Sequence, residues 1–284
     1  MKIKPVTGKK EGGLLSYCLL NLQVSNDHLN TLPVKVGLFI PCYIDQFYPQ
    51  VGIASLQLLE KLGCEVEYPQ GQTCCGQPMA NSGYEHLTHQ CNSLFIKNFA
   101  DYDYIVGPSG SCVLHIKDHL HDPAAETAAT HIRERIYELT EFLTDVLKVQ
   151  NLPARFPCKV GLHQSCHGQR GLALAQMSEL VAAPFSKPEK LLRMVEGVEL
   201  VPLDRQDECC GFGGTFCVTE EAVSVKMGKD RVADHVKHGA EVITGTDVSC
   251  LMHMEGILRR RHAGVKVMHI AEILNQNIHE QANS

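Results

Sequence analysis

The chain has 284 residues, which is enough for one large domain or two domains of ordinary size. Its hydrophobic fraction of 44% and charged fraction of 20% are those of a globular protein, so a disordered chain is excluded. The net charge of −6 gives the chain no excess of positive charge that would attract nucleic acid, and we therefore expect no nucleic-acid partner.

The thirteen cysteines are the unusual part of the composition, and an odd number cannot all pair as disulfides. A secreted disulfide scaffold would normally be shorter and would begin with a signal peptide. The apolar run 14–22 is followed by no small-residue cleavage site and is too short to cross a bilayer. We therefore predict a cytoplasmic protein with no transmembrane segment and a flexible N-terminal extension over residues 1–33. In that reducing compartment, clustered cysteines indicate metal binding or catalysis.

From Val34 onward, short apolar runs alternate with helical periodicity, as in an α/β protein. Strands are predicted at 34–40, 64–68 and 104–106. Helices are predicted at 46–62, 80–99 and 112–121, and a last strand and helix share residues 135–147.

The second half repeats this order of elements. Strands are predicted at 159–162, 198–203 and 241–244, helices at 219–237 and 250–261, and 265–278 closes the half. Lys159-Val160-Gly161-Leu162 mirrors Lys35-Val36-Gly37-Leu38. The repeat predicts two tandem, duplicated α/β domains, each a small, mainly parallel sheet flanked by helices. We place them at 34–150 and 158–284.

The cysteines that repeat between the halves follow one order, Cys … Cys-Cys-Gly … Cys-x-x-His, which occurs twice. They are Cys42, Cys74, Cys75 and Cys112 with His115 in the first half, and Cys166, Cys209, Cys210 and Cys250 with His253 in the second. Adjacent side chains of an extended chain point to opposite faces, so a Cys-Cys pair reaches one centre only across a sharp turn. Gly76 and Gly211 can provide that turn because glycine adopts positive φ without steric cost. A single zinc is usually bound by cysteines two to four residues apart, whereas an adjacent pair suits a larger centre with several metal atoms.

Each of these eight cysteines lies just after the carboxyl end of a predicted strand, at or before the start of a helix. In a parallel sheet these ends share one edge, where ligands bind, and helix N-termini stabilise thiolates. We therefore predict that the eight cysteines bind metal, as one iron–sulfur centre per half. His115 and His253 share a helical face with Cys112 and Cys250, so they are candidate further ligands or contacts. The other cysteines are predicted to be core or surface thiols: Cys18, Cys64, Cys91, Cys158 and Cys217.

Other motifs of redox enzymes are missing from the sequence. It contains no C-x-x-C-x-x-C-x-x-x-C-P run, no nucleotide fingerprint and no local Ser-His-Asp-like motif. The predicted metal centres could carry electrons, but the sequence shows no site for taking a hydride from an organic substrate. We therefore expect the chain to be one subunit of a larger redox enzyme.

The twice-repeated cysteine pattern resembles the cysteine-rich CCG domain. That domain occurs in heterodisulfide reductase, in the iron–sulfur subunit of glycolate oxidase and in the lactate utilization protein A family. The chain is most similar to the last family, which is short and carries two CCG domains without a ferredoxin domain. The resemblance extends from Val34 to the C-terminus. It is strengthened by two sequence segments, Pro108-Ser109-Gly110-Ser111-Cys112 and Asp247-Val248-Ser249-Cys250-Leu251-Met252-His253.

The resemblance implies an iron–sulfur electron-transfer subunit of an L-lactate-oxidising complex. Its partners would be two other iron–sulfur subunits of the lactate utilization complex and an electron acceptor of the respiratory chain. Cys42, Cys74, Cys75 and Cys112 would then hold one iron–sulfur cluster, and Cys166, Cys209, Cys210 and Cys250 a second. Heterodisulfide reductase ends each motif in Cys-x-x-Cys, where this chain has Cys-x-x-His. This departure leaves open whether the clusters are of its 4Fe-4S type.

Two alternatives follow from the same residues. The chain could be a thiol–disulfide redox catalyst that works at the cluster, as in heterodisulfide reductase. It could also be a zinc-stabilised scaffold subunit with no redox role, since zinc is possible at one site. Iron and acid-labile sulfide would separate the first two hypotheses from the third.

Overall fold

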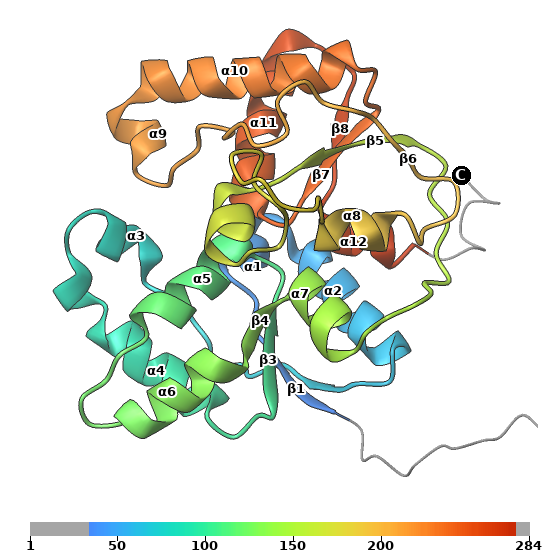
Figure 1. Ribbon diagram of the computed structural model, residues 1–284. Coiled ribbons are helices and arrows are strands. Elements are labelled where there is room, and N and C mark those ends of the chain that lie inside the picture. Colours follow the sequence, from blue (N-terminus) through green and yellow to red (C-terminus); the bar gives the residue numbers. More distant parts are fainter. Residues whose placement is uncertain (1–33, 277–284) are drawn as a thin grey trace, which may run out of the picture. The chain divides into compact units, whose positions relative to one another are not determined.

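The computed structural model describes residues 34–276 (Figure 1). The extension predicted over residues 1–33 lies outside the described residues, as do residues 277–284. Within the described range the chain forms two parallel sheets and the helices that cover them. The domain limits 34–150 and 158–284 stay a prediction.

The first sheet contains four parallel strands in the order β2-β1-β3-β4. They are β1 (Lys35–Leu38), β2 (Glu65–Glu67), β3 (Tyr104–Gly107) and β4 (Ile136–Glu138). Val36 at the centre pairs with Val66 on one side and Tyr104 on the other. The β-branched and aromatic residues of these runs favour strands that are covered on both faces.

The second sheet repeats this topology with the order β6-β5-β7-β8, again all parallel. Its strands are β5 (Lys159–His163), β6 (Glu199–Leu200), β7 (Val242–Gly245) and β8 (Lys266–Val267). Val160 occupies the central position that Val36 has in the first sheet. The predicted fold class, α/β with two duplicated parallel sheets, is confirmed.

The helices follow the strands as the sequence order requires. In the first half they are α1 (Cys42–Phe47), α2 (Pro49–Lys61), α3 (Gln77–Asn81), α4 (His89–Phe99), α5 (Gly110–His119), α6 (Glu126–Arg135) and α7 (Leu139–Glu141), with short turns at Glu85–Leu87 and Phe142–Val146. In the second half they are α8 (Lys187–Leu192), α9 (Phe216–Thr219), α10 (Glu221–Lys237), α11 (Val248–Arg261) and α12 (Ile270–Leu274), with a wide turn at His167–Gly171.

Four of these helices, α2, α7, α8 and α12, form a layer between the two sheets (Figure 1). Their apolar side chains join those of both sheets in one core, which includes Val36, Leu59, Val160, Leu191 and Ile270. Helices α4, α5 and α6 cover the other face of the first sheet, and α10 and α11 cover that of the second. The shared core fixes the two sheets with respect to each other, because each fully buried aliphatic side chain contributes about 1.5–3 kcal/mol.

Some helices of the structure differ from the predicted ones. The helix predicted at 46–62 is two helices, α1 and α2, because Pro49 has no N–H to continue the first one. The helix predicted at 80–99 is interrupted at Gly83, whose φ of 84° is incompatible with a right-handed helix. Helix α6 was not predicted, since its buried face consists mainly of Ala129 and Ile132.

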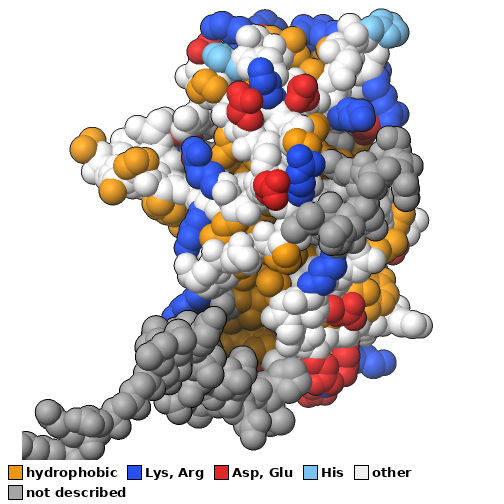
Figure 2. All heavy atoms as spheres, turned by 90° about the vertical axis from the view of Figure 1, so that its right-hand side faces the viewer, with side chains coloured by type: hydrophobic (Ala, Val, Ile, Leu, Met, Phe, Trp, Pro, Cys, Tyr) orange, Lys and Arg blue, Asp and Glu red, His pale blue; other side chains and the backbone are white. Residues whose placement is uncertain are grey.

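The solvent-facing side chains seen in Figure 2 are mixed in character. On this face, lysine and arginine lie among aspartate and glutamate, with apolar side chains between them. Across residues 34–276, no helix is both long enough and apolar enough to cross a bilayer.

Candidate metal centre

All eight repeated cysteines line one cavity of about 380 Å³. The lining contains Cys42, Cys74, Cys75 and Cys112 from the first half and Cys166, Cys209, Cys210 and Cys250 from the second. The single cysteines lie at helix starts just after strands β1, β3, β5 and β7, and the two pairs lie in the loops that follow β2 and β6. The topology thus brings together thiols from six loops at the carboxyl edges of two parallel sheets.

The first group of four sulfurs is held closely enough for its thiols to share protons. The Sγ atoms of Cys42 and Cys74 are 3.8 Å apart. The neighbouring thiols of Cys42 and Cys75 lower the pKa of Cys74 far below its ordinary value, and the N–H of Gly76 adds to this effect. Conversely, contact with Cys74 and burial raise the pKa of Cys42, and contact with Cys112 and Cys74 raises that of Cys75. One thiolate is therefore stabilised by thiols that stay protonated.

The second group of four repeats this electrostatic pattern. The neighbouring thiols of Cys166 and Cys210 lower the pKa of Cys209 far below its ordinary value. The pKa of Cys166 is raised by its contact with Cys209, and that of Cys210 by contact with Cys209 and Cys250. Four sulfurs so close cannot all ionise unless cations lie between them.

The turn between each pair of adjacent cysteines is made as the sequence predicted. Gly76 and Gly211 have φ angles of 89° and 85°, in the left-handed region. Their N–H groups point back at the first cysteine of each pair, 3.4 Å from Cys74 Sγ and 3.3 Å from Cys209 Sγ. A third N–H, that of Phe212, lies 3.5 Å from Cys210 Sγ. Backbone donors of this kind stabilise negative charge on sulfur.

The two cysteine groups are tied together through Asp247, which the sequence analysis did not single out. Its Oδ1 accepts hydrogen bonds from Ser109 Oγ at 3.0 Å, Ser111 N at 2.9 Å and Ser111 Oγ at 2.8 Å. The N–H of Gly110 also donates to the carbonyl of Thr246, at 3.3 Å. The starts of α5 and α11, which carry Cys112 and Cys250, are therefore fixed to each other.

A buried histidine, His163, also lies beside the cysteines and is absent from the predicted site residues. One of its ring nitrogens and the Sγ atoms of Cys210 and Cys250 all lie within 4.8 Å of one another. Its Nδ1 accepts a hydrogen bond from Arg231 Nε at 3.1 Å. Burial, together with the charge of Arg231, lowers the pKa of His163 well below its ordinary value. The available signal was its position in the repeat, at the end of the strand that begins Lys159-Val160-Gly161-Leu162.

The two predicted histidines lie at the margin of the site, and neither ring lines the cavity. His115 is buried and stacks on His119 with 4.9 Å between ring centroids, and burial lowers its pKa to about 4. His253 Nε2 lies 3.3 Å from the carbonyl oxygen of Ser224. Their role as metal ligands stays a prediction.

The other described cysteines are not among the residues that line the cavity. Cys64 is buried in the core, and Cys91, Cys158 and Cys217 are half-buried. Cys18 lies outside the described residues. Among the described residues, no two cysteines form a disulfide.

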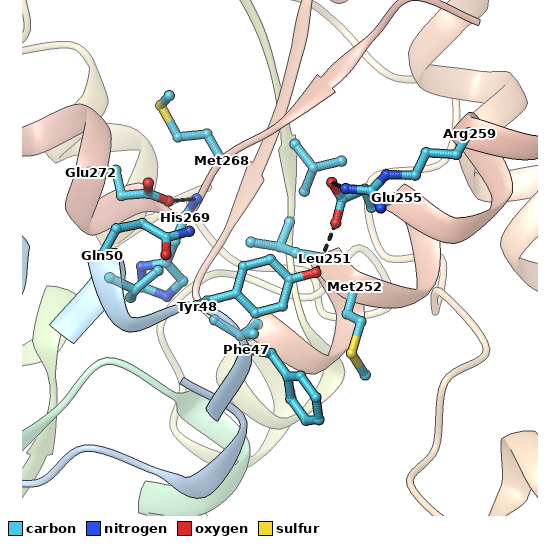
Figure 3. Close-up of a pocket in the computed structure, with 13 residues that line it drawn as sticks. Phe47, Tyr48, Gln50, Leu251, Met252, Glu255, Arg259, Met268, His269 and Glu272 are labelled. Atoms are coloured by element: carbon cyan, nitrogen blue, oxygen red, sulfur yellow. Dashed lines mark hydrogen bonds and ion pairs between the residues drawn. The ribbon is translucent and has the colours of Figure 1, made fainter. Parts of the chain in front are cut away.

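A second pocket, shown in Figure 3, has a different character. It lies between the start of α2, helix α11 and the segment from β8 to α12, and several of its polar groups bind one another. Tyr48 donates to Glu255 at 2.7 Å, Arg259 donates to the same carboxylate at 2.7 Å, and the N–H of His269 donates to Glu272 at 2.9 Å. These paired groups are not free to bind a ligand, whereas the cysteine cavity is lined by eight thiols.

The eight cysteines that line the cavity offer sulfur donors of the kind that bind a metal ion or a metal cluster. Sulfur ligands select zinc, copper(I) or iron–sulfur centres. The close contacts between neighbouring thiols, and the backbone N–H groups that point at sulfur, fit a bound cationic centre in each half.

Comparison with known proteins identifies the family. The family model for the CCG cysteine-rich domain matches residues 36–117 and 160–255. A crystal structure of a hypothetical protein from Helicobacter pylori is similar in fold, with a TM-score of 0.54 and 13% identity. That similarity covers 86% of this chain and 49% of the other, and it shows the fold alone.

Curated relatives are similar over most of the chain. Lactate utilization protein A from Exiguobacterium sp. is 44% identical over 86% of this chain and 98% of its own length. Lactate utilization protein A from Bacillus subtilis is 42% identical over 85% of this chain and 99% of its own length. Identity at this level over nearly the whole of each relative, together with two CCG matches, places this chain in the lactate utilization protein A family.

Proposed function

We propose that the chain is the iron–sulfur electron-transfer subunit of a complex that oxidises L-lactate. Each half would hold one iron–sulfur centre, with its four cysteines as ligands. The relatives named lactate utilization protein A support the connection to lactate. We further propose that the protein works in the cytoplasm with other iron–sulfur subunits and passes electrons towards an acceptor of the respiratory chain.

The observation that carries this proposal is the convergence of eight thiols from six loops on one cavity. A structural zinc site needs four ligands and is closed around a single ion. Here each half supplies an adjacent cysteine pair, and both groups open on the same space. When bound, an iron–sulfur centre accepts and releases single electrons.

The chain's own residues would do three things for such a centre. The cysteines hold it, and the N–H groups of Gly76, Gly211 and Phe212 stabilise charge on the sulfurs. The hydrogen bonds of Asp247 keep the two sites at a fixed separation, which electron transfer between them requires. Burial of Cys75, Cys112, Cys210 and Cys250 limits the access of water.

The direct test is the metal content of protein purified without oxygen. We expect iron and acid-labile sulfide in comparable amounts, a visible absorption band and reduction of the protein by the lactate-oxidising complex. Stoichiometric zinc without sulfide, and no visible absorption, would contradict the proposal and support the zinc-stabilised scaffold.

The shared cavity also supports a second candidate function, disulfide reduction at the centre. A cavity of about 380 Å³ between two sulfur groups has room for a small substrate. If this function holds, a disulfide reoxidises the reduced protein, and Cys74→Ser or Cys209→Ser abolishes the reoxidation. A simple relay would show no reaction with disulfides.

A further inference from the structure

The two halves place chemically different side chains at equivalent positions beside their cysteines. Helices α4 and α10 pack on the two sheets in the same register. A Cβ added to Gly76 would meet Thr88 in the residue before α4, and one added to Gly211 would meet Ser224 in α10. This register makes Phe95 of α4 the equivalent of Arg231 of α10.

Two glycines of the strands, Gly37 in β1 and Gly161 in β5, confirm this register. Their neighbours on the helices lie four residues after Phe95 and Arg231. A Cβ added to Gly37 would meet Phe99, and one added to Gly161 would meet His235. Phe39 and His163 directly follow the matching Lys-Val-Gly-Leu runs of β1 and β5. The trio Phe39, Phe95 and Phe99 in the first half is thus replaced by His163, Arg231 and His235 in the second.

In the first half this trio is a purely apolar cluster. Phe39 packs edge-on against Phe95, with ring centroids 5.0 Å apart, and against Phe99 at 5.9 Å. The cluster belongs to the same buried core as Cys75 and Cys112. No side-chain donor therefore comes from this trio to the first group of sulfurs.

In the second half the trio is polar, and hydrogen bonds fix the orientation of two of its members, His163 and Arg231. The side chain of Arg231 is 0% exposed, and its Nε donates to His163 Nδ1 at 3.1 Å. Its other nitrogens donate to the carbonyls of Arg205 and Leu162. Asp234 Oδ2 lies 3.5 Å from Arg231 Nη1 and offsets its charge. A guanidinium has only donors and stays charged in proteins, so the direction of the hydrogen bond to His163 is certain.

That direction determines which nitrogen of His163 carries the proton. Because Nδ1 accepts from Arg231, the proton of the neutral ring is on Nε2. A proton on Nδ1 would face the N–H of Arg231 at 3.1 Å. Nε2 is fully buried, and it has no hydrogen-bond partner in the described part of the protein. A buried N–H needs an acceptor, and the sulfurs of Cys210 and Cys250 lie near the ring.

We propose that His163, oriented by Arg231, is a positioning residue that donates an N–H hydrogen bond to the sulfurs of the second centre and gives that centre the higher electron affinity. This inference rests on the proposed function only in its second part. An N–H directed at the sulfurs stabilises the added negative charge of the reduced state. One electron delivered to the first centre would therefore pass on to the second, and this transfer returns the first centre to its oxidised state.

The proton position is tested first, by nitrogen NMR of the full chain labelled with ¹⁵N-histidine. We expect His163 to be a neutral ring protonated on Nε2, with its signal identified by its absence in His163→Gln. A ring protonated on Nδ1, with Nε2 bound to metal, would overturn the inference and make His163 a ligand. The measurement applies to a chain that holds iron or zinc, so its result does not depend on the proposed function.

The electron affinity is tested by redox titration followed by electron paramagnetic resonance. A Cys75→Ser background isolates the second centre, and a Cys210→Ser background isolates the first. We expect His163→Phe, which copies Phe39, to lower the potential of the second centre by at least the equivalent of a tenfold change in the one-electron equilibrium, about 59 mV. His163→Gln should retain the wild-type potential, because its amide oxygen can accept from Arg231 and its amide N–H can donate to sulfur.

A matched control separates this effect from general destabilisation. Phe39→Leu changes the equivalent core position of the first half without removing a hydrogen bond, so the potential of the second centre should stay unchanged. An unchanged potential in His163→Phe would overturn the role of His163 in electron affinity. Absence of iron and sulfide from the wild-type protein would instead overturn the proposed function and, with it, this second part, leaving the proton position to stand on the NMR result.

Discussion

The loops that carry the two cysteine pairs are held in place by different kinds of interaction, an uncharged amide in the first half and charged side chains in the second. In the first half, Gln72 fastens the loop to strand β1, since its Oε1 accepts from Ile40 N at 2.7 Å and its Nε2 donates to Leu38 O at 3.1 Å. In the second half, buried charges fasten the loop to α10. Arg231 donates to the carbonyl of Arg205, and Asp234 accepts from the backbone N–H of Arg205 at 3.1 Å.

This difference shows what a duplicated fold leaves free to change. The sheet order and the cysteine positions are the same in both halves, because they bring the thiols together. The residues around them can be apolar or charged, provided that a buried charge finds partners. Arg231 meets this condition with bonds to His163, Arg205 and Leu162 and with Asp234 close by.

The largest expected effect tests whether the halves bind metal independently. Cys75→Ser and Cys210→Ser should each remove about half of the bound iron and sulfide, because serine is a poor ligand for the soft metals that thiolates select. Metal analysis and the absorption spectrum of each variant measure the effect. Loss of all metal from either single variant would show that the eight cysteines hold one shared centre.

The second prediction concerns opposite responses to pH at two equivalent helix caps. Glu138 caps the N-terminus of α7 and accepts from Thr140 N at 2.7 Å, while His269 caps the N-terminus of α12 and accepts from Ala271 N at 3.1 Å. Burial raises the pKa of Glu138 from 4.5 to about 8 and lowers that of His269 from 6.5 to about 4. In both cases the folded state keeps the side chain neutral.

The two groups therefore destabilise the fold at opposite ends of the pH range. Glu138 lowers the free energy of unfolding as pH rises from 4.5 to about 8, because only the unfolded chain ionises there. His269 lowers it as pH falls from 6.5 towards 4, because only the unfolded chain binds the proton. The contribution is on the order of 5 kcal/mol for Glu138 and on the order of 3 kcal/mol for His269.

Urea unfolding at several pH values measures both contributions. Relative to wild type, Glu138→Gln should gain stability as pH rises from about 5 to about 8, whereas His269→Gln should gain stability as pH falls from 6.5 to about 5. Glutamine keeps an oxygen that can cap each helix. The variants should therefore differ from wild type mainly in how steeply the free energy of unfolding changes with pH. Parallel curves for wild type and either variant would contradict the assignment of that pKa shift.

The sequence predicted the architecture and the cysteine positions because both depend on patterns that occur twice. The Lys-Val-Gly-Leu runs, the two Cys-Cys-Gly motifs and the matching order of strands are visible without coordinates. The predicted convergence of the cysteines followed from the geometry of parallel sheets, in which all carboxyl ends meet at one edge. The turn at each pair followed from glycine alone.

The roles of Asp247, His163 and Arg231 could not be predicted in this way. Asp247 acts on Ser109 and Ser111 in the other half, and no local pattern specifies that contact. Arg231 lies on a helix with many charged residues, where a solvent-exposed position is the ordinary expectation. Only the packing of α10 against β5 shows that its guanidinium is buried and directed at His163.

The smallest predicted effect compares the two pair turns through their glycines, with Gly63 as a matched control. All three have φ between 85° and 89°, so alanine is strained by about 1 kcal/mol at each. A Cβ at Gly63 meets nothing within 4 Å, whereas one at Gly76 lies 3.1 Å from the side chain of Thr88. At Gly211 it lies 2.6 Å from the backbone oxygen of Ser224 in α10.

The cost of alanine should therefore rise in the order Gly63, Gly76, Gly211, because a threonine side chain can shift but a helix backbone resists displacement. We expect losses of about 1 kcal/mol at Gly63, about 1–2 kcal/mol at Gly76 and about 2–3 kcal/mol at Gly211. Urea unfolding of the three single variants under one set of conditions gives these values. Equal losses at Gly76 and Gly211 would mean that α10 can move away from its cysteine pair as easily as Thr88 can shift. The second turn would then be no more tightly enclosed than the first.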